Sequence, residues 1–259
     1  MQMIALILLG LIVSSCRLPL SSATSSYGEA SQPGEVTEQV NKTVTLAPGA
    51  GVKISGLNGR VTIETSSSDK AEINITIKAS DREAIERRPL LIENTPNSLV
   101  IRTKEGEKWN RDRGWVRHEV RLRLPKSIDL NVSGINGQVD VGQITGQIEI
   151  SGINGQVEVA QAGTATRISG INGRTAISLV QLGQGGLRVS GINGGVEIGL
   201  PSATNAEVDV SGVNGGIDTD LPITILGEIK RGQLRGTIGS GGPSINISGI
   251  NGGVVLRRI

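Results

Sequence analysis

The stretch IEISGINGQVEV, residues 148–159, decides the fold. Its first and last three residues, IEI and VEV, alternate apolar and acidic side chains, which indicates short strands with one face turned toward a core. The SGING between them contains two glycines, which accept positive φ, and an asparagine, which tolerates the left-handed region. The stretch therefore predicts two strands joined by a tight corner.

Copies of this motif recur along the chain. There are seven, namely SGLNG at 55–59, SGING at 133–137, 151–155, 169–173, 190–194 and 248–252, and SGVNG at 211–215. From the second copy onward the central asparagines stand at 136, 154, 172, 193, 214 and 251, so the intervals are 18, 18, 21, 21 and 37. The last interval is about two periods long, and we interpret QLRGTI at residues 233–238 inside it as a degenerate copy. A period near 20 is typical of stacked units that cannot bury their apolar faces alone.

Two strands and two corners per repeat predict an all-β fold, a single-stranded parallel β-helix (β-solenoid) with a strand-rich insert and one short helix. Coils about 4.8 Å apart would place like residues on like, with aliphatic columns inside. The handedness of the coil stays open. The asparagines would form a structural ladder of stacked amides that serves the backbone and comprises Asn58, Asn136, Asn154, Asn172, Asn193, Asn214 and Asn251.

Composition excludes several classes of protein. The 259 residues include 37 Gly and no Phe, and the only aromatic residues are Tyr27, Trp109 and Trp115, so the core must be aliphatic. A formal net charge of +2 gives no bulk field for nucleic acid. One Cys and one His exclude a disulfide framework and Cys/His zinc sites, and we expect neither a metal nor a cofactor.

The outward columns predict side-chain neighbours if the coils stack in chain order. Before the motif, Glu149 would then face Arg167, and Arg188 would face Asp209. After the motif the column is mostly acidic, and we interpret it as a hydrated face, with a weak cation-binding stripe as the alternative; it contains Thr62, Asp140, Glu158, Ala176, Glu197, Asp218 and Val255. The last coil would leave an edge at residues 254–256 that is guarded by Arg257 and Arg258, which suggests end-to-end homotypic association.

Residues 66–127 do not repeat, and we expect them to interrupt the solenoid as an insert. Strands are predicted at 72–78, 99–103 and 118–124, and Ser80-Asp81 can cap a short helix that extends through Arg88. His118 lies in this insert, away from the repeats that hold nearly all the Ser-Gly pairs, so it is poorly placed as a base for a serine nucleophile.

One aromatic and basic cluster stands out within the insert, in KWNRDRGW at residues 108–115. Exposed Trp and Arg are enriched at binding hot spots, so the candidate binding loop comprises Trp109, Arg111, Arg113, Trp115 and Arg117. The alternative is that the indoles cover one end of the solenoid and that the arginines are simply solvated.

The N-terminus has the pattern of a bacterial export signal. Residues 1–15 carry no charged side chain and include an apolar run at 4–13 that is too short to span a bilayer. Residues 13–16, VSSC, resemble a lipobox, although the basic residue usual before the apolar run is missing; an ordinary secretory peptide is the alternative. We expect a signal peptide at 1–15, a lipid on Cys16, a flexible tether over 16–39, and a folded domain over 40–259. Arg17 after the cysteine favours the outer membrane under the lipoprotein sorting rule.

The order of lipobox, strand-rich segment with a short helix, Pro125-Lys126 and recurring Gly-Ile-Asn-Gly strands resembles a bacterial adhesin family, the head GIN-type, β-strand-repeat domains of unknown function. The resemblance covers roughly residues 40–259. It implies an envelope-associated β-helix with an adhesin-like or envelope-stress role, and it offers no catalytic residues.

These observations favour a lipid-anchored, non-catalytic adhesin-like binding or scaffolding protein of the cell envelope, with no enzyme activity. We expect it to contact the membrane through the lipid on Cys16, to bind a glycan or a protein, and not to bind nucleic acid. It would face either the periplasm or the cell surface. The alternatives are a polysaccharide-active β-helix enzyme, whose candidates Asp140, Glu158, Glu197, Asp218 and Asp220 are scattered along one column, and a periplasmic structural protein of the envelope-stress response.

Overall fold

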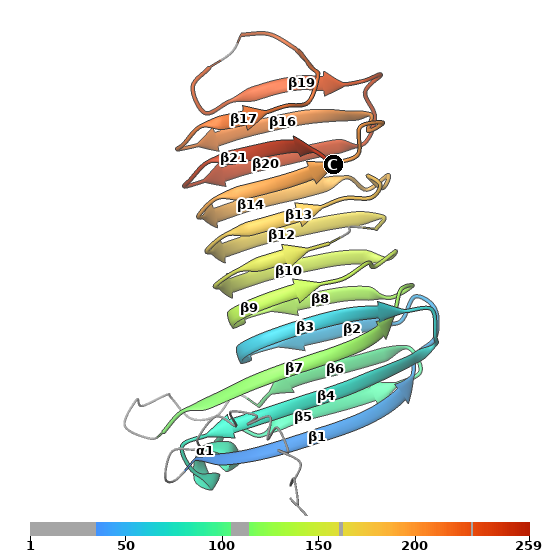
Figure 1. The fold of residues 1–259 in the computed structure, drawn as a ribbon, viewed down its shortest axis with the longest axis vertical. Helices are drawn as coiled ribbons and strands as arrows, with labels where there is room; N and C mark the ends of the chain where they lie inside the picture. The colour runs from blue at the N-terminus through green and yellow to red at the C-terminus, as the bar shows by residue number, and fades with distance from the viewer. Residues whose placement is uncertain (1–34, 105–113, 161–162, 229) are drawn as a thin grey trace, which may run out of the picture. The chain divides into compact units, whose positions relative to one another are not determined.

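The computed structural model describes residues 35–104, 114–160, 163–228 and 230–259 (Figure 1). These residues are almost entirely β-strand, with one short helix, α1 (Arg82–Arg87), so the all-β class is confirmed. The strands belong to one large sheet. Within the described ranges, no helix has the length and apolar character needed to cross a bilayer.

Each motif joins two strands, which together we call a rung. The strands that lead into the motifs are β2 (Gly51–Ser55), β8 (Asp129–Ser133), β10 (Gln147–Asn154), β12 (Ala165–Asn172), β14 (Leu187–Asn193), β16 (Ala206–Val213) and β20 (Ser244–Ile250). The strands that follow are β3 (Asn58–Ser66), β9 (Asn136–Val141), β11 (Val157–Val159), β13 (Thr175–Ser178), β15 (Val196–Leu200), β17 (Ile217–Thr219) and β21 (Val254–Arg258). We call these two sets the leading ladder and the following ladder.

Rungs pair in parallel, with like residues in register. Ile150, for example, pairs with Val132 on one side and Ile168 on the other. Buried aliphatic residues line the interior, since β-branched side chains pack well on identical neighbours. One buried column of the leading ladder, in spatial order, is Val52, Leu130, Ile148, Thr166, Leu187, Ile245 and Val208.

The rungs do not stack in chain order at the C-terminal end, which corrects the sequence prediction. The last rung, β20 with β21, pairs with β14 and β15 on one side and with β16 and β17 on the other. Figure 1 shows it inserted between β14 and β16. The edge expected at residues 254–256 is therefore covered by β17, and the predicted end-to-end contact through that strand is wrong.

The segment interpreted as a degenerate repeat is likewise not a parallel rung. β19 (Leu234–Ile238) pairs antiparallel with β16, and the short β18 (Ile223–Ile225) pairs antiparallel with β19. These two strands end the leading ladder. The motif is lost here because an antiparallel strand has no rung-to-rung corner to make.

The insert extends the stack rather than interrupting it, which is a second correction. The first rung lies directly on the second, since β2 pairs with β8 and β3 with β9. On its other side, β2 pairs with β6 (Ser98–Thr103) and β3 with β7 (Val116–Pro125), both in parallel. Residues 66–127 therefore add parallel strands to the side of the first rung that faces away from the second rung.

Antiparallel strands then close this end. β4 (Lys70–Ala79) pairs with β7 and with β1 (Val36–Thr45), while β5 (Leu90–Thr95) pairs with β6. The strands predicted at 72–78, 99–103 and 118–124 and the helix capped by Asp81 are present. β5 and β1 were not predicted from the sequence, and β1 begins before the domain boundary expected at residue 40. Lys42 of β1 donates to Asn94 Oδ1 of β5 at 2.6 Å, joining the two end strands.

Candidate binding surfaces

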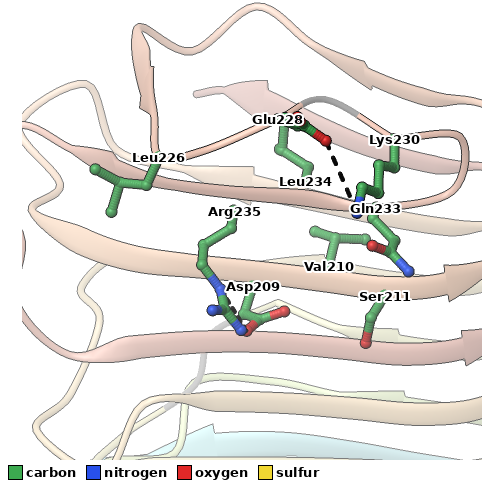
Figure 2. A pocket seen from close by; sticks show the side chains of 9 residues that line it. All are labelled: Asp209, Val210, Ser211, Leu226, Glu228, Lys230, Gln233, Leu234 and Arg235. Atoms are coloured by element: carbon green, nitrogen blue, oxygen red, sulfur yellow. Dashed lines mark hydrogen bonds and ion pairs between the residues drawn. The ribbon is translucent and has the colours of Figure 1, made fainter.

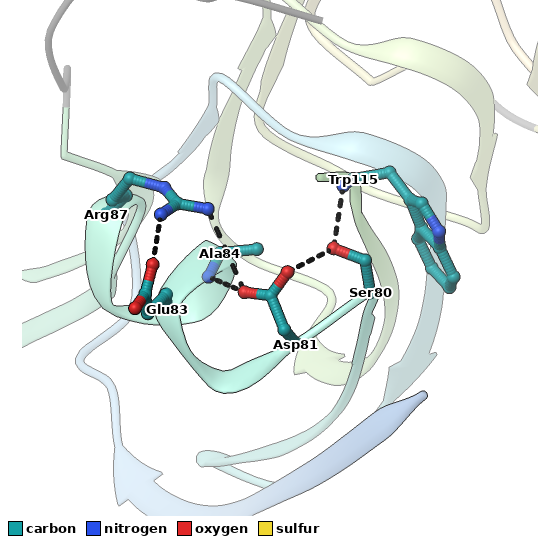
Figure 3. A network of polar contacts seen from close by, with 6 residues as sticks. All are labelled: Ser80, Asp81, Glu83, Ala84, Arg87 and Trp115. Carbon is teal, nitrogen blue, oxygen red and sulfur yellow. Dashed lines mark hydrogen bonds and ion pairs between the residues drawn. The ribbon is translucent and has the colours of Figure 1, made fainter. Parts of the chain in front are cut away.

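The candidate Trp and Arg loop is only partly described. Trp109, Arg111 and Arg113 lie outside the described residues. Trp115 is 43% exposed, and Arg117 on β7 is also exposed. The backbone of Trp115 is held by Ser80, whose N–H donates to the Trp115 carbonyl at 3.0 Å and whose hydroxyl accepts from the Trp115 N–H at 3.2 Å. The indole is thus presented on a fixed backbone (Figure 3).

The same network begins α1. Asp81 is the N-cap, and its Oδ1 accepts from the Ala84 N–H at 2.7 Å while Oδ2 accepts from the Ser80 hydroxyl at 2.9 Å (Figure 3). The Ala84 N–H, the Ser80 hydroxyl and Arg87 hold the pKa of the Asp81 carboxyl below its ordinary value. Arg87 also pairs with Glu83 at 2.8 Å. Each of these polar groups has an internal partner, so the network has a structural role.

His118 lies next to the first motif, although the sequence placed it away from the repeats. It pairs in register with Gly59, is 3% exposed, and accepts from the Asn58 N–H through Nδ1 at 3.4 Å. Burial lowers the pKa of His118, and the nearby Arg88 lowers it further. Its Nε2 has no hydrogen-bond partner in the described part of the chain. His118 is therefore a buried imidazole beside the first motif, and its surroundings disfavour the protonated form.

The seven asparagines form one series of side-chain hydrogen bonds. Each Nδ2 donates to the Oδ1 of the neighbouring rung at 2.8–3.3 Å, in the order Asn214, Asn251, Asn193, Asn172, Asn154, Asn136, Asn58. The series ends where Asn58 Nδ2 donates to the Val116 carbonyl of β7 at 2.9 Å. All donors point the same way, so the amides act as structural connectors, as in other in-register β-stacks.

The acidic column does not bring a pair of carboxyl groups together over a cleft. Asp140 and Glu158 are register neighbours, but Val255 lies between Glu197 and Asp218. Glu197 pairs with Arg174 and, at 3.1 Å, with Arg257, and Asp220 accepts from the Arg258 N–H at 2.7 Å. In the described ranges, no group of three or more His, Cys, Asp and Glu residues is placed to hold a metal ion.

The outer face of the leading ladder carries its charges in a different order from that expected. Because β20 is inserted, Arg188 faces Asn246, and Asp209 lies one rung further on. The predicted Arg188–Asp209 neighbours are therefore wrong. Asp209 instead pairs with Arg235 of β19, whose Nη2 and Nε lie 2.6 and 3.1 Å from Oδ2. Glu149 does face Arg167 in register.

Two hollows lie at the C-terminal end. One, of about 260 Å³, is formed under the segment after β18 and is lined by polar side chains, including the Asp209–Arg235 pair, together with Leu226 (Figure 2). The other, of about 550 Å³, lies beside β17 and is lined by Ile217, Leu234, Lys230 and Arg231 among others. The leading ladder ends under β19, whereas β17 pairs with β21 and with no second strand among the described residues.

No family model and no curated protein matches the chain. Among solved structures it is similar to a putative cell adhesion protein from Clostridium sporogenes ATCC 15579, with 14% identity and a TM-score of 0.51 over 86% of this chain and 100% of that chain. A putative adhesin from Bacteroides fragilis NCTC 9343 gives 12% identity and a TM-score of 0.38 over 86% and 97% of the two chains. At such identities the first likeness shows the fold alone, and the second score is too low to support an argument.

Proposed function

We propose that the protein is a non-catalytic, adhesin-like binding or scaffolding protein of the bacterial cell envelope, built as a single-stranded parallel β-helix. The observation that carries this proposal is the unbroken register of seven rungs, which stacks the motif serines on one another and lines up the varied polar residues of the outer face in columns. Such a surface offers many weak polar contacts along one axis, and binding through it gains by multivalency. The cell-adhesion name of the structurally similar protein from Clostridium sporogenes agrees with this function.

The arrangement of titratable groups supports a binding role over hydrolysis. General acid and base catalysis needs two positioned groups with distinct environments around one substrate atom. In the described residues, Glu197 and Asp220 are tied to arginines or backbone, and His118 is buried in a rung junction. Within the described residues, the two carboxylates and His118 do not line a common cleft.

The membrane part of the proposal rests on the sequence, because Cys16 lies outside the described residues. We place a diacylglyceryl group on the Cys16 thiol and the protein at the outer membrane. The residues between Cys16 and β1 are rich in Ser, Thr, Gly and Pro, which suits a tether that lets the folded domain reach a partner.

The anchor and the orientation are tested in cells. The full chain, expressed in a Gram-negative bacterium, should incorporate labelled palmitate and fractionate with outer membranes, and the Cys16→Ala variant should do neither. Protease treatment of intact cells then separates surface display, where the folded domain is digested, from a periplasmic position, where it is protected. Equal labelling of both proteins would refute the anchor.

Binding and catalysis are separated with the purified full chain in non-ionic detergent. Immobilised protein should retain envelope or host-surface glycans or proteins, and incubation with the same polysaccharides should release no shorter fragments. Release of fragments would replace the proposal with a polysaccharide-active enzyme, and failure to retain any material would leave only a structural role.

A further inference from the structure

Two arginines stand side by side on the outer face of the leading ladder. Arg167 of β12 and Arg188 of β14 are register partners on adjacent strands, and both side chains are exposed. Within the described ranges neither arginine has an ion pair or a side-chain hydrogen bond. Like charges directly opposite on neighbouring strands repel, so this pair lowers the stability of the fold.

The neighbouring carboxylates do not neutralise the pair. On the β14 side the next residue is Asn246, and Asp209 beyond it is held by Arg235. On the β12 side Glu149 faces Arg167, but its Oε2 accepts from Asn131 Nδ2 at 3.0 Å, and no ion pair forms with the arginine. The inserted last rung thus separates Arg188 from the carboxylate that chain order would have placed beside it.

The surface around the pair is polar and slightly hollowed. Ser169 and Ser190 follow Arg167 and Arg188 by two residues, so their side chains point to the same face. A depression of about 300 Å³ begins at Arg167 and runs along the same face to Lys53, which lies three rungs away. Lys53 and Arg167 stand at its two ends, but the carboxylates of Asp129 and Glu149 also line it, so the cationic part of this face is the arginine pair and not the depression.

We propose that this face binds an acidic polysaccharide, with a carboxylate or sulfate group held between Arg167 and Arg188. Guanidinium groups are suited to forked hydrogen bonds with such anions. The serine hydroxyls and Asn131 can contact sugar hydroxyls. The inference rests on the proposed binding function and names its ligand class.

The same face disfavours other polyanions. The chain has three aromatic residues, Tyr27, Trp109 and Trp115, and none is on β12 or β14, so nucleic-acid bases would find no stacking platform. The large exposed apolar residues in the described ranges, Trp115, Val180, Ile225, Leu226 and Ile259, also lie off these strands. A hydrophilic polymer with spaced anionic groups fits best.

The test measures affinity of the full chain in non-ionic detergent for polygalacturonate, chondroitin sulfate, neutral dextran and single-stranded DNA. The variant R167Q/R188Q removes the pair. The control R60Q/R123Q removes the same charge from two exposed arginines of β3 and β7, on the following-ladder side. Two partly exposed ion contacts predict that R167Q/R188Q binds about 2- to 30-fold more weakly to an acidic polysaccharide. The control should weaken binding by less than about twofold, which is below the loss expected for R167Q/R188Q.

Each outcome decides the inference. It is supported if an acidic polysaccharide binds, dextran does not, and only the R167Q/R188Q variant weakens. It is overturned if neither acidic polymer binds, if the control loses as much, or if DNA binds equally with the same dependence on the arginines. Retention of surface material in the capture experiment without any acidic polysaccharide binding would refute this ligand class and leave the binding function standing. If the immobilised protein retains no material at all, both this ligand class and the proposed binding function are refuted.

Discussion

Replacing Gly155 by alanine should strongly destabilise the stack, because the corner has no room for a Cβ. Gly155 has φ of +155°, and a Cβ at this position would collide with the carbonyl oxygen of Gly137 on the preceding rung and lie 2.7 Å from its carbonyl carbon. Both obstructing atoms are backbone, so no side chain can rotate away. The same close approach recurs at the corresponding glycines of neighbouring rungs.

The magnitude follows from two costs. A backbone conformation unfavourable to an L-residue costs about 1–2 kcal/mol, and forcing an extra methyl group into a packed contact costs about 1–3 kcal/mol. Together they predict that Gly155→Ala lowers the free energy of unfolding by about 2–5 kcal/mol. For a domain of this size that corresponds to a fall in Tm of about 4–20 °C.

Two other glycines supply matched controls. Gly195 and Gly253 do not have positive φ, and the nearest atoms to an added Cβ are backbone oxygens at 3.9 and 3.6 Å. Alanine at these positions should be neutral or up to about 1 kcal/mol stabilising, because it restricts the unfolded chain. Urea unfolding followed by circular dichroism gives the three free energies. If Gly155→Ala matched the controls, the close stacking of corners would be wrong.

Three further perturbations test other parts of the structure. Asn154→Ala removes the hydrogen bonds to Asn136 and from Asn172, both exposed. It should lower the free energy of unfolding by about 1 kcal/mol; no change would mean that water replaces the ladder fully. The pKa of His118 is lowered in the folded state, so the unfolded chain takes up its proton first, and stability should fall as pH drops below about 6.5 and level off below the folded pKa. This fall should shrink in His118→Gln, measured by urea unfolding between pH 8 and 5, and an unchanged pH profile would contradict it. Ending the chain before Ser244 removes the rung that joins β14 to β16, so limited proteolysis should trim the product to a core ending near Leu200. Survival of residues 206–238 would show that β16 can dock on β14 directly.

Local patterns accounted for most of the strands. Alternation and capping signals located β4, β6, β7 and the helix that begins after Asp81, since these depend on neighbouring residues along the chain. β1 was missed because its sequence, VTEQVNKTVT, interrupts the apolar alternation with polar residues such as Lys42, which stands between Val40 and Val44 in the alternation but is exposed. The charge neighbours of Arg188 were misassigned because they depend on the order of the rungs.

The sequence by itself determined which residues share a column, because seven near-identical motifs stack in register only when each motif residue lies on its equivalent in the next rung. Only the tertiary structure decided which rung lies beside which. Equivalent rungs present the same backbone edge and the same Ser, Gly and Asn side chains, so pairing energy barely distinguishes Asn214 from Asn251 as the neighbour of Asn193. The longer connection after Asn214 accounts for this order, because it forms the antiparallel β18–β19 pair and then places the last rung between β14 and β16.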